Sequence, residues 1–328
     1  MGEGALNAPR PLLAVTGLRV QFPGPRGQIA AIDDVSFTIA PGETLGIVGE
    51  SGAGKSLTGA AIIGLIPSPG KLAGGENLLD GERIDGLGDD AMRRVRGARI
   101  GVVFQDHLAS LDPLFTIGDQ LIETIRVHTS LNAAQARDRA VALLTEVGIP
   151  APAARLSSYP HQFSGGMRQR VVIALALAGK PRLLIADEPT TALDVSVQAQ
   201  IIALLQRLCR QAGVAVVLIS HDMGVIAEAA DRIAVMYAGR IVEIGPATQV
   251  LRRPRHPYTA GLMDSIPRIG SRQAKLRQIE GAMPQLSELP SGCAFHPRCP
   301  QAQDRCRAER PALVAIAEGA TACWLHRA

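Results

Sequence analysis

The stretch that decides the fold reads Thr44-Leu45-Gly46-Ile47-Val48, followed directly by Gly49-Glu50-Ser51-Gly52-Ala53-Gly54-Lys55-Ser56. It predicts a buried strand, a glycine-rich turn and the beginning of a helix. Glycines in such a turn let backbone N–H groups converge on a phosphate, and the helix N-terminus adds the positive end of its dipole. We therefore predict that residues 49–56 bind nucleotide phosphates, with Lys55 on the β- and γ-phosphates and Ser56 on Mg²⁺. The structural alternative is a glycine-rich turn with an incidental lysine.

Length and composition predict one large nucleotide-binding domain with an appendage, because 328 residues exceed the usual single-domain size. The net charge is +4, but acidic and basic residues are interspersed, so the composition does not favour nucleic acid as a partner. No apolar run approaches the ~20 residues of a membrane span. The segment Met1–Pro11 lacks the pattern of a signal peptide, so we expect a cytosolic chain.

The pattern of apolar residues and turn signals predicts alternating strands and helices. We expect strands at 12–22, 29–39, 74–84, 99–104, 183–186 and 214–219, with a closing hairpin at 232–237 and 240–244. We expect helices at 55–66, 90–96, 117–127 and 133–147, the last two within an inserted helical subdomain. Phe22 ends the first expected strand and can stack on an adenine ring, although a core position is an equal alternative.

Polar side chains follow three of the expected strands, at the sheet edge where parallel sheets bind ligands. Gln105 can bond a Mg²⁺-bound water, and Asp187-Glu188 supply a Mg²⁺ ligand and a base for an attacking water. His221 follows the strand at 214–219, with a helix-capping role as its structural alternative. Ser164 is a natural N-cap, and the Gly165-Gly166 pair after it leaves N–H groups open to an anion, although a simple capped helix is the plainer interpretation.

Four of the five cysteines crowd into the end of the chain: Cys293, Cys299, Cys306 and Cys323. The fifth, Cys209, lies on an expected helix face and is interpreted as core. In a cytosolic chain this crowding favours a metal over disulfides. The spacing fits the paired knuckles of structural zinc poorly, whereas an iron–sulfur cluster takes four thiolates at varied spacing. We favour a [4Fe-4S] cluster, with zinc and packed free thiols as the alternatives.

These motifs occur in the order seen in ATP-binding-cassette (ABC) ATPases, which the chain resembles. They are the P-loop at 49–56, Gln105, Ser164-Gly165-Gly166, Asp187-Glu188, Ala192-Leu193-Asp194 and His221. The resemblance implies an α/β fold with a mixed sheet core, an antiparallel β subdomain and a helical subdomain at about 106–180. The ABC domain would cover residues 1–254, and a small Cys-rich extension residues 255–328.

The resemblance also implies a nucleotide sandwich between two head-to-tail subunits. Ser164, Gly165, Gly166 and Asp194 would then contact an ATP held mainly by the other subunit, with Asp194 linking the two sites. Glu188 would be the general base, His221 would contact the γ-phosphate, and Ser56, Asp187 and Gln105 would serve Mg²⁺. Met167 stands where the family commonly has glutamine.

The strings RHPYTAGLMDSIP from Arg255 and GCAFHPRCP from Gly292 are similar to the C-terminal extension of ATP-binding subunits of bacterial oligopeptide/dipeptide importers. This resemblance implies a heterodimer with a sister ATPase, two membrane permeases and an external substrate-binding protein, at the cytoplasmic face of the inner membrane. The loop at 106–116 would receive a permease. Some relatives carry an iron–sulfur cluster on such cysteines. The cargo would be peptides by default, with nickel, glutathione or another small solute as alternatives.

Two other functional classes remain open on the sequence. One is a soluble ABC ATPase that acts on nucleic acid, with the cysteines as a zinc module, but the chain shows no basic patch or long inserted arm. The other is a non-catalytic regulatory cassette that senses redox state or metal. The intact Glu188 and His221 argue against it.

Overall fold

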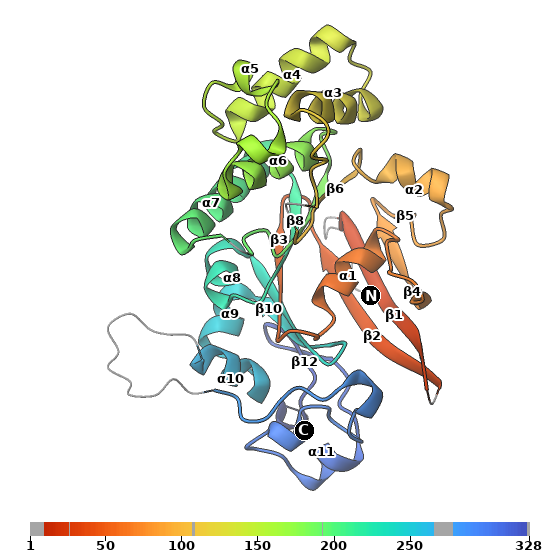
Figure 1. Ribbon diagram of the computed structural model, residues 1–328. Coiled ribbons are helices and arrows are strands. Elements are labelled where there is room, and N and C mark those ends of the chain that lie inside the picture. Colours follow the sequence, from red (N-terminus) through yellow and green to blue (C-terminus); the bar gives the residue numbers. More distant parts are fainter. Residues whose placement is uncertain (1–9, 26, 107–108, 192, 266–277, 327–328) are drawn as a thin grey trace, which may run out of the picture. The chain divides into compact units, whose positions relative to one another are not determined.

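The computed structural model describes residues 10–25, 27–106, 109–191, 193–265 and 278–326. The chain forms two compact units, each assembled from segments that are distant in sequence (Figure 1). The first unit contains residues 1–12, 39–43 and 86–218, and the second contains residues 13–38, 44–85 and 219–328. Ala192 of the expected turn and residues 107–108 of the loop after Gln105 lie outside the described residues.

Two parallel strands form the centre of the first unit. Strand β6 (Ile100–Val103) pairs with β7 (Leu183–Asp187), with Ile100 opposite Leu183 and Val103 opposite Ala186. Both strands are buried along nearly their whole length, which explains their continuous apolar sequence. The next strand, β8 (Ala215–Ser220), begins beside them, since the N–H of Ala215 donates to the carbonyl of Arg182 at 2.9 Å.

Helices make up the rest of the first unit, and the expected helical subdomain is present. Helix α3 (Ile117–His128) packs against α4 (Ala133–Glu146) and α6 (Gly165–Leu177). Capping boxes at Thr116 and Asn132 begin α3 and α4, because each side chain accepts a backbone N–H of the first turn. The remaining helices are α2 (Asp89–Val95), α5 (Pro152–Arg155) and α7 (Val195–Ala212), with a 3-10 turn, η1 (Pro160–Gln162).

The second unit contains an antiparallel sheet with strand order β2-β1-β4-β5. Strand β1 (Leu13–Gly24) pairs with β4 (Lys71–Leu79), which pairs in turn with the short β5 (Glu82–Arg83). Strand β2 (Gly27–Ile39) alternates buried and exposed residues over its second half, as its sequence predicts. This sheet is the expected antiparallel β subdomain.

A mixed sheet positions the glycine-rich loop in the same unit. Strand β3 (Thr44–Val48) runs parallel to β9 (Arg232–Tyr237), and β9 pairs antiparallel with β10 (Arg240–Pro246) as the expected hairpin. Helix α1 (Lys55–Ile62) follows the loop, and α8 (Met223–Ala229) packs on β3. Helix α1 is shorter than the expected 55–66, because Gly64 adopts a left-handed conformation with φ of 65°.

The end of the chain continues this mixed sheet. Strand β12 (Gly319–Thr321) pairs antiparallel with β10 and with β11 (Val314–Ile316). Around these strands lie α9 (Ala247–Arg252), α10 (Pro257–Asp264), α11 (Asp304–Ala308) and the turns η2 (Leu286–Glu288), η3 (His296–Arg298) and η4 (Trp324–His326). No helix in the described ranges is long and apolar enough to cross a membrane.

Candidate functional site

The glycine-rich loop has the geometry that its sequence predicts. It connects the buried strand β3 to α1, and Gly49, Gly52 and Gly54 have φ of 158°, 82° and 100°. A Cβ on Gly49 would lie 2.2 Å from the carbonyl oxygen of Met236 in β9. Because only glycine fits against that carbonyl, the loop leaves its strand along one fixed path.

Lys55, the first residue of α1, is only 5% exposed. Its ammonium group donates to the carbonyls of Gly49 at 2.9 Å and Glu50 at 3.1 Å. The lysine is therefore folded back over its own loop, and Ser56 follows it on the exposed side. Of the remaining loop residues, Ala53 is buried and Ser51 and Gly52 are exposed.

Phe22 lies within β1 and not at its end, because the strand continues to Gly24. Its side chain is half-buried, and a Cβ on Gly70 would lie 2.5 Å from its ring. The ring therefore rests on the loop between α1 and β4. Stacking of Phe22 on adenine remains a prediction.

The strand-end polar residues of the first unit come together as expected. Gln105 follows β6 and Glu188 follows β7, and the amide Nε2 of Gln105 donates to Oε2 of Glu188 at 3.3 Å. The hydroxyl of Thr191 donates to the same carboxylate oxygen at 2.9 Å. Asp187 is the last residue of β7, so two carboxylates and an amide lie at one sheet edge.

Glu188 also has an unusual backbone conformation. Its φ is 46°, in the left-handed region, and Pro189 follows it. This conformation costs a non-glycine residue of the order of 1 kcal/mol or more, and such strain clusters at functional sites. The cost is consistent with a position selected to direct the Glu188 carboxylate.

The segment around Ser164 begins a helix as predicted. Ser164 is the N-cap of α6, and its hydroxyl accepts the N–H of Met167 at 3.3 Å. Its side chain is exposed, Gly165 and Gly166 are half-buried, and a Cβ on Gly166 would meet a methyl of Val197 in α7 at 2.8 Å. Asp194 is the exposed N-cap of α7 and makes no side-chain capping bond.

His221 is exposed directly after β8. It does not cap the following helix, because Asp222 is the N-cap of α8 and accepts the N–H groups of Gly224 at 2.7 Å and Val225 at 3.4 Å. The structural alternative for His221 therefore loses its support.

The four C-terminal cysteines line one small pocket, together with His256 and Trp324. Burial raises the pKa of Cys293 to about 11 and also raises the pKa values of Cys299 and Cys323. Across the described ranges, no group of three or more His, Cys, Asp or Glu side chains is arranged to hold a metal ion. Cys209 is 2% exposed, as expected for a core position.

Backbone N–H groups point at the sulfurs in that pocket. Phe295, Gln301 and Leu325 each donate to the cysteine two residues before them, and the N–H of Gln303 approaches the sulfur of Cys306 at 3.5 Å. Such donors stabilise thiolates. The donor set thus has the chemistry of a thiolate metal site.

Two residues that the motif analysis gave no role also contact the P-loop. Tyr258 and Arg298, both from the C-terminal part of the chain, bond to Glu50. No local sequence signal could identify them, because they lie more than two hundred positions from Glu50 in the sequence.

Comparisons with known proteins agree with this geometry. The family described as "ABC transporter" matches residues 32–191, and the family described as "Oligopeptide/dipeptide transporter, C-terminal region" matches residues 242–306. The dipeptide transport ATP-binding protein DppD of Escherichia coli (strain K12) is 47% identical over 308 residues, 94% of each chain. This chain belongs to the ABC transporter family. The oligopeptide transport ATP-binding protein OppD of Salmonella typhimurium (strain LT2) is 46% identical over 97% of this chain and 96% of its own.

Solved ABC cassettes share the fold. The dimeric bacterial ABC transporter cassette MJ0796 has a TM-score of 0.64 at 30% identity, and covers 72% of this chain and 98% of its own. The structure of cbiO1 from Clostridium perfringens, part of an ABC transporter complex, has a TM-score of 0.64 at 27% identity, and covers 74% of this chain and 91% of its own.

As an ABC family member, the chain is an ATPase that uses ATP with Mg²⁺, which confirms the predicted fold class and activity. The relatives are transport ATP-binding proteins, which supports the transporter interpretation over a nucleic-acid ATPase or a non-catalytic cassette.

Proposed function

We propose that this chain is the ATP-hydrolysing subunit of an importer for dipeptides or oligopeptides. The observation that carries the proposal is a phosphate-binding loop with a buried lysine, in a chain that matches a dipeptide transport protein over 94% of its length. Hydrolysis would drive the opening and closing of the partner permeases. A related small solute is the alternative cargo, since selectivity resides in subunits other than this one.

The ATP site would be built mainly from backbone groups. Residues 49–56 would hold the phosphates, Lys55 would move from its own loop carbonyls onto the β- and γ-phosphates, and Phe22 would stack on the adenine. Ser56, Asp187 and Gln105 would hold Mg²⁺ and its waters. The existing Lys55 bonds to Gly49 and Glu50 support this role, because they show the ammonium already at the loop's inner face.

Hydrolysis would depend on the carboxylate of Glu188. It would orient and deprotonate the attacking water, while His221 contacts the γ-phosphate. The bond from Gln105 to Glu188 and the strained backbone of Glu188 support this assignment, because both fix the direction of the carboxylate.

A second set of residues would act on the ATP of another subunit. Ser164, Gly165 and Gly166 begin α6, a helix of 13 residues whose first N–H groups suit an anion, and Asp194 begins α7 without a capping bond of its own. We propose that they face a sister ATPase in a heterodimer. The complex would also contain two permeases, which contact the loop at 106–116, and an extracytoplasmic substrate-binding protein. The chain would then be a peripheral subunit at the cytoplasmic face of the inner membrane, with an ABC domain at 1–254 and an extension at 255–328.

The first experiment is a mild-detergent isolation of the tagged chain from its native membranes, with identification of everything that co-purifies. We expect a sister ATPase and two permeases. The matched control carries Lys55→Ala, which should keep the partners and lose ATP hydrolysis. A chain that co-purifies with nucleic acid or with no partner would overturn the transporter proposal. Two copies of this chain without a second ATPase would overturn the heterodimer alone.

We also propose that Cys293, Cys299, Cys306 and Cys323 hold a [4Fe-4S] cluster, with zinc as the alternative. The donor chemistry fits, since four sulfurs line one pocket and backbone N–H groups point at them. When bound, the group would cross-link η3, α11 and the segment after β12. Thiolate ligands must lose their protons, so a bound metal should be released as the pH falls.

Anaerobic isolation tests this proposal. A cluster predicts broad absorption near ~400 nm and iron with acid-labile sulfide. Cys299→Ser should remove both, whereas Cys209→Ser, at a core cysteine outside the pocket, should not. Zinc without absorption would favour the alternative, and neither metal would leave packed thiols.

A further inference from the structure

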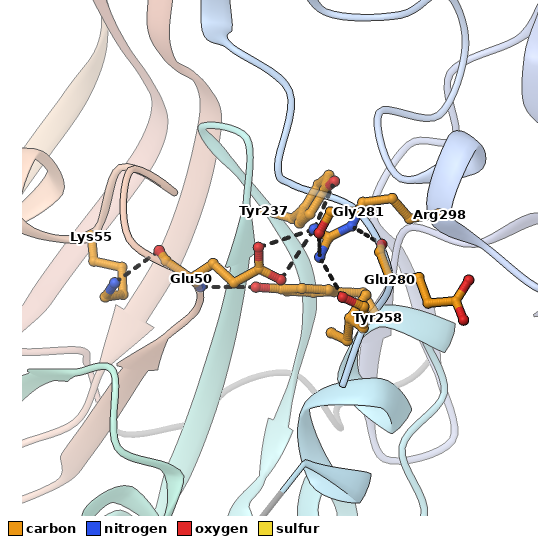
Figure 2. A network of polar contacts seen from close by, with 8 residues as sticks. Glu50, Lys55, Tyr237, Tyr258, Glu280, Gly281 and Arg298 are labelled. Carbon is orange, nitrogen blue, oxygen red and sulfur yellow. Dashed lines mark hydrogen bonds and ion pairs between the residues drawn. The ribbon is translucent and has the colours of Figure 1, made fainter. Parts of the chain in front are cut away.

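The Glu50 residue of the P-loop is held from two sides by the C-terminal part of the chain (Figure 2). Its backbone N–H donates to the phenol oxygen of Tyr258 at 2.9 Å. Its carboxylate accepts Nη1 of Arg298 at 3.1 Å and 3.0 Å, one distance to each oxygen. Both the backbone and the side chain of this residue are therefore fixed by groups from outside the loop.

Arg298 is itself locked in place. Its side chain is 7% exposed, against 27% for Glu50. Its other nitrogens donate to the carbonyls of Glu280 at 2.9 Å and Gly281 at 3.1 Å, as Figure 2 shows. Its guanidinium lies 5.9 Å from the ring centroids of both Tyr237 and Phe295. An arginine held on so many sides loses little further freedom when it pairs with a carboxylate.

Tyr258 is positioned just as firmly. It is fully buried, and its ring packs edge-on against Tyr237 with centroids 4.6 Å apart. Its N–H donates to Nδ1 of His256, and the N–H of His256 donates to the buried carboxylate of Glu243 in β10 at 2.8 Å. The phenol oxygen that receives Glu50 is thus fixed relative to the mixed sheet.

The same segment also covers the loop directly. A Cβ on Gly52 would lie 3.1 Å from the terminal methyl of Met283, two residues after Gly281. On the other side of Glu50, its carbonyl accepts the ammonium of Lys55. One residue therefore joins the C-terminal segment to the lysine that receives the phosphates.

We propose that Tyr258 and Arg298 are positioning residues for ATP binding, which hold Glu50 so that the loop is formed before the nucleotide arrives. A loop that is ordered in advance binds more tightly, because the ligand does not have to supply the cost of ordering it. The proposal rests on the proposed function only in taking ATP as the ligand of residues 49–56. It assigns the C-terminal extension a part in nucleotide affinity.

The decisive variant is Tyr258→Phe, which removes one oxygen and keeps the buried ring. The full-length chain would be titrated with a non-hydrolysable ATP analogue. We expect affinity to fall about five- to tenfold, as for a moderate coupling between sites. In the assembled transporter, KM for ATP should rise with little change in kcat. A purely structural role would instead lower the amount of active protein and leave KM unchanged.

Tyr237→Phe is the matched control. It removes an equally buried phenol hydroxyl, which is 3.4 Å from Arg298 and makes no recorded bond to the loop. We expect a much smaller change in affinity. Arg298→Gln should weaken binding as Tyr258→Phe does, whereas Arg310→Gln, which breaks the exposed ion pair of the extension with Asp33, should not.

Four outcomes separate the hypotheses. If Tyr258→Phe and Arg298→Gln both bind the analogue as the unmodified chain does, the positioning proposal is wrong and the ATPase assignment stands. If Tyr237→Phe weakens binding as much as Tyr258→Phe does, general loosening of the aromatic cluster explains the effect and the proposal is also wrong. If the unmodified chain does not bind while folded, the proposed function itself fails. If Glu50→Gln weakens binding and adding Arg298→Gln weakens it no further, the two residues act through one contact, as proposed.

Discussion

The P-loop and the start of α6 are both glycine-containing helix N-termini suited to anions, but they are held in different ways. Three glycines of the P-loop have positive φ, Gly49 lies against the carbonyl of a neighbouring strand, and Lys55 is buried. At α6, Ser164 is exposed and bonds only within its own helix. The first site is completed by distant segments of its own unit, whereas the second relies on a local cap. That difference is what a divided ATP site requires, with one part that binds and another part that is offered to a neighbour.

The largest expected effects separate binding from turnover. Glu188→Gln should reduce kcat by about 10²–10⁴, the usual contribution of a general base, and leave ATP affinity nearly unchanged. Lys55→Ala should instead abolish detectable ATP binding. Steady-state hydrolysis and equilibrium binding on the same preparations measure both. Unchanged hydrolysis in Glu188→Gln would remove this residue as the base.

A pair of glycine substitutions tests the backbone difference. Gly49→Ala should destabilise the chain by more than ~2 kcal/mol, because its Cβ would meet a backbone carbonyl at 2.2 Å. Gly166→Ala should cost only about 1 kcal/mol, because its Cβ would meet a side-chain methyl of Val197 that can shift. Denaturant unfolding gives both values. Equal costs would show that the two loops are equally constrained.

A smaller effect is expected at the local cap. Ser164→Ala should lower the stability of the chain by about 1 kcal/mol, the usual cost of losing an N-cap. It should not change ATP binding by the isolated chain, but should lower hydrolysis in the assembled transporter. Weaker binding by the isolated chain would contradict the proposed action on a second subunit. Ser164→Asp, which keeps a capping oxygen, serves as the control for stability.

The smallest expected effect concerns Phe22. Phe22→Ala should weaken ATP binding about threefold if the ring stacks on adenine, which is within the usual value of such contacts. Binding of inorganic tripolyphosphate, which has no base, should not change. An equal loss for both ligands, with a lower melting temperature, would show that the ring only packs against Gly70.

Sequence patterns predicted the parts of this molecule that local physics determines. The run Thr44–Ser56 contains its own strand, turn and helix signals, and the carboxylates after β7 could be placed at the sheet edge because parallel strands end together. The helix after the P-loop ended earlier than predicted, because Gly64 stops it before Pro67. A turn glycine inside an apolar run is hard to tell from a tolerated one.

The contacts that sequence could not predict are those between distant segments. Strands β11 and β12 are short, with half of their residues exposed or nearly so, and only their pairing with β10 identifies them. The bond between Arg298 and Glu50 spans 248 positions. Charge pairs of this kind have no periodicity, so they emerge only from the folded chain.

The pairing of β12 with β10 also has a practical consequence for protein engineering. The carboxylate of Glu243 is 2% exposed and accepts the N–H groups of Arg255 and His256, while β12 covers the edge of β10. A chain truncated at residue 254 would leave a buried charge without these donors and an open sheet edge. Chimeras that exchange C-terminal segments between related ATPases should therefore transfer β10 and β12 together. They should also keep the residue at position 50 matched to those at positions 258 and 298.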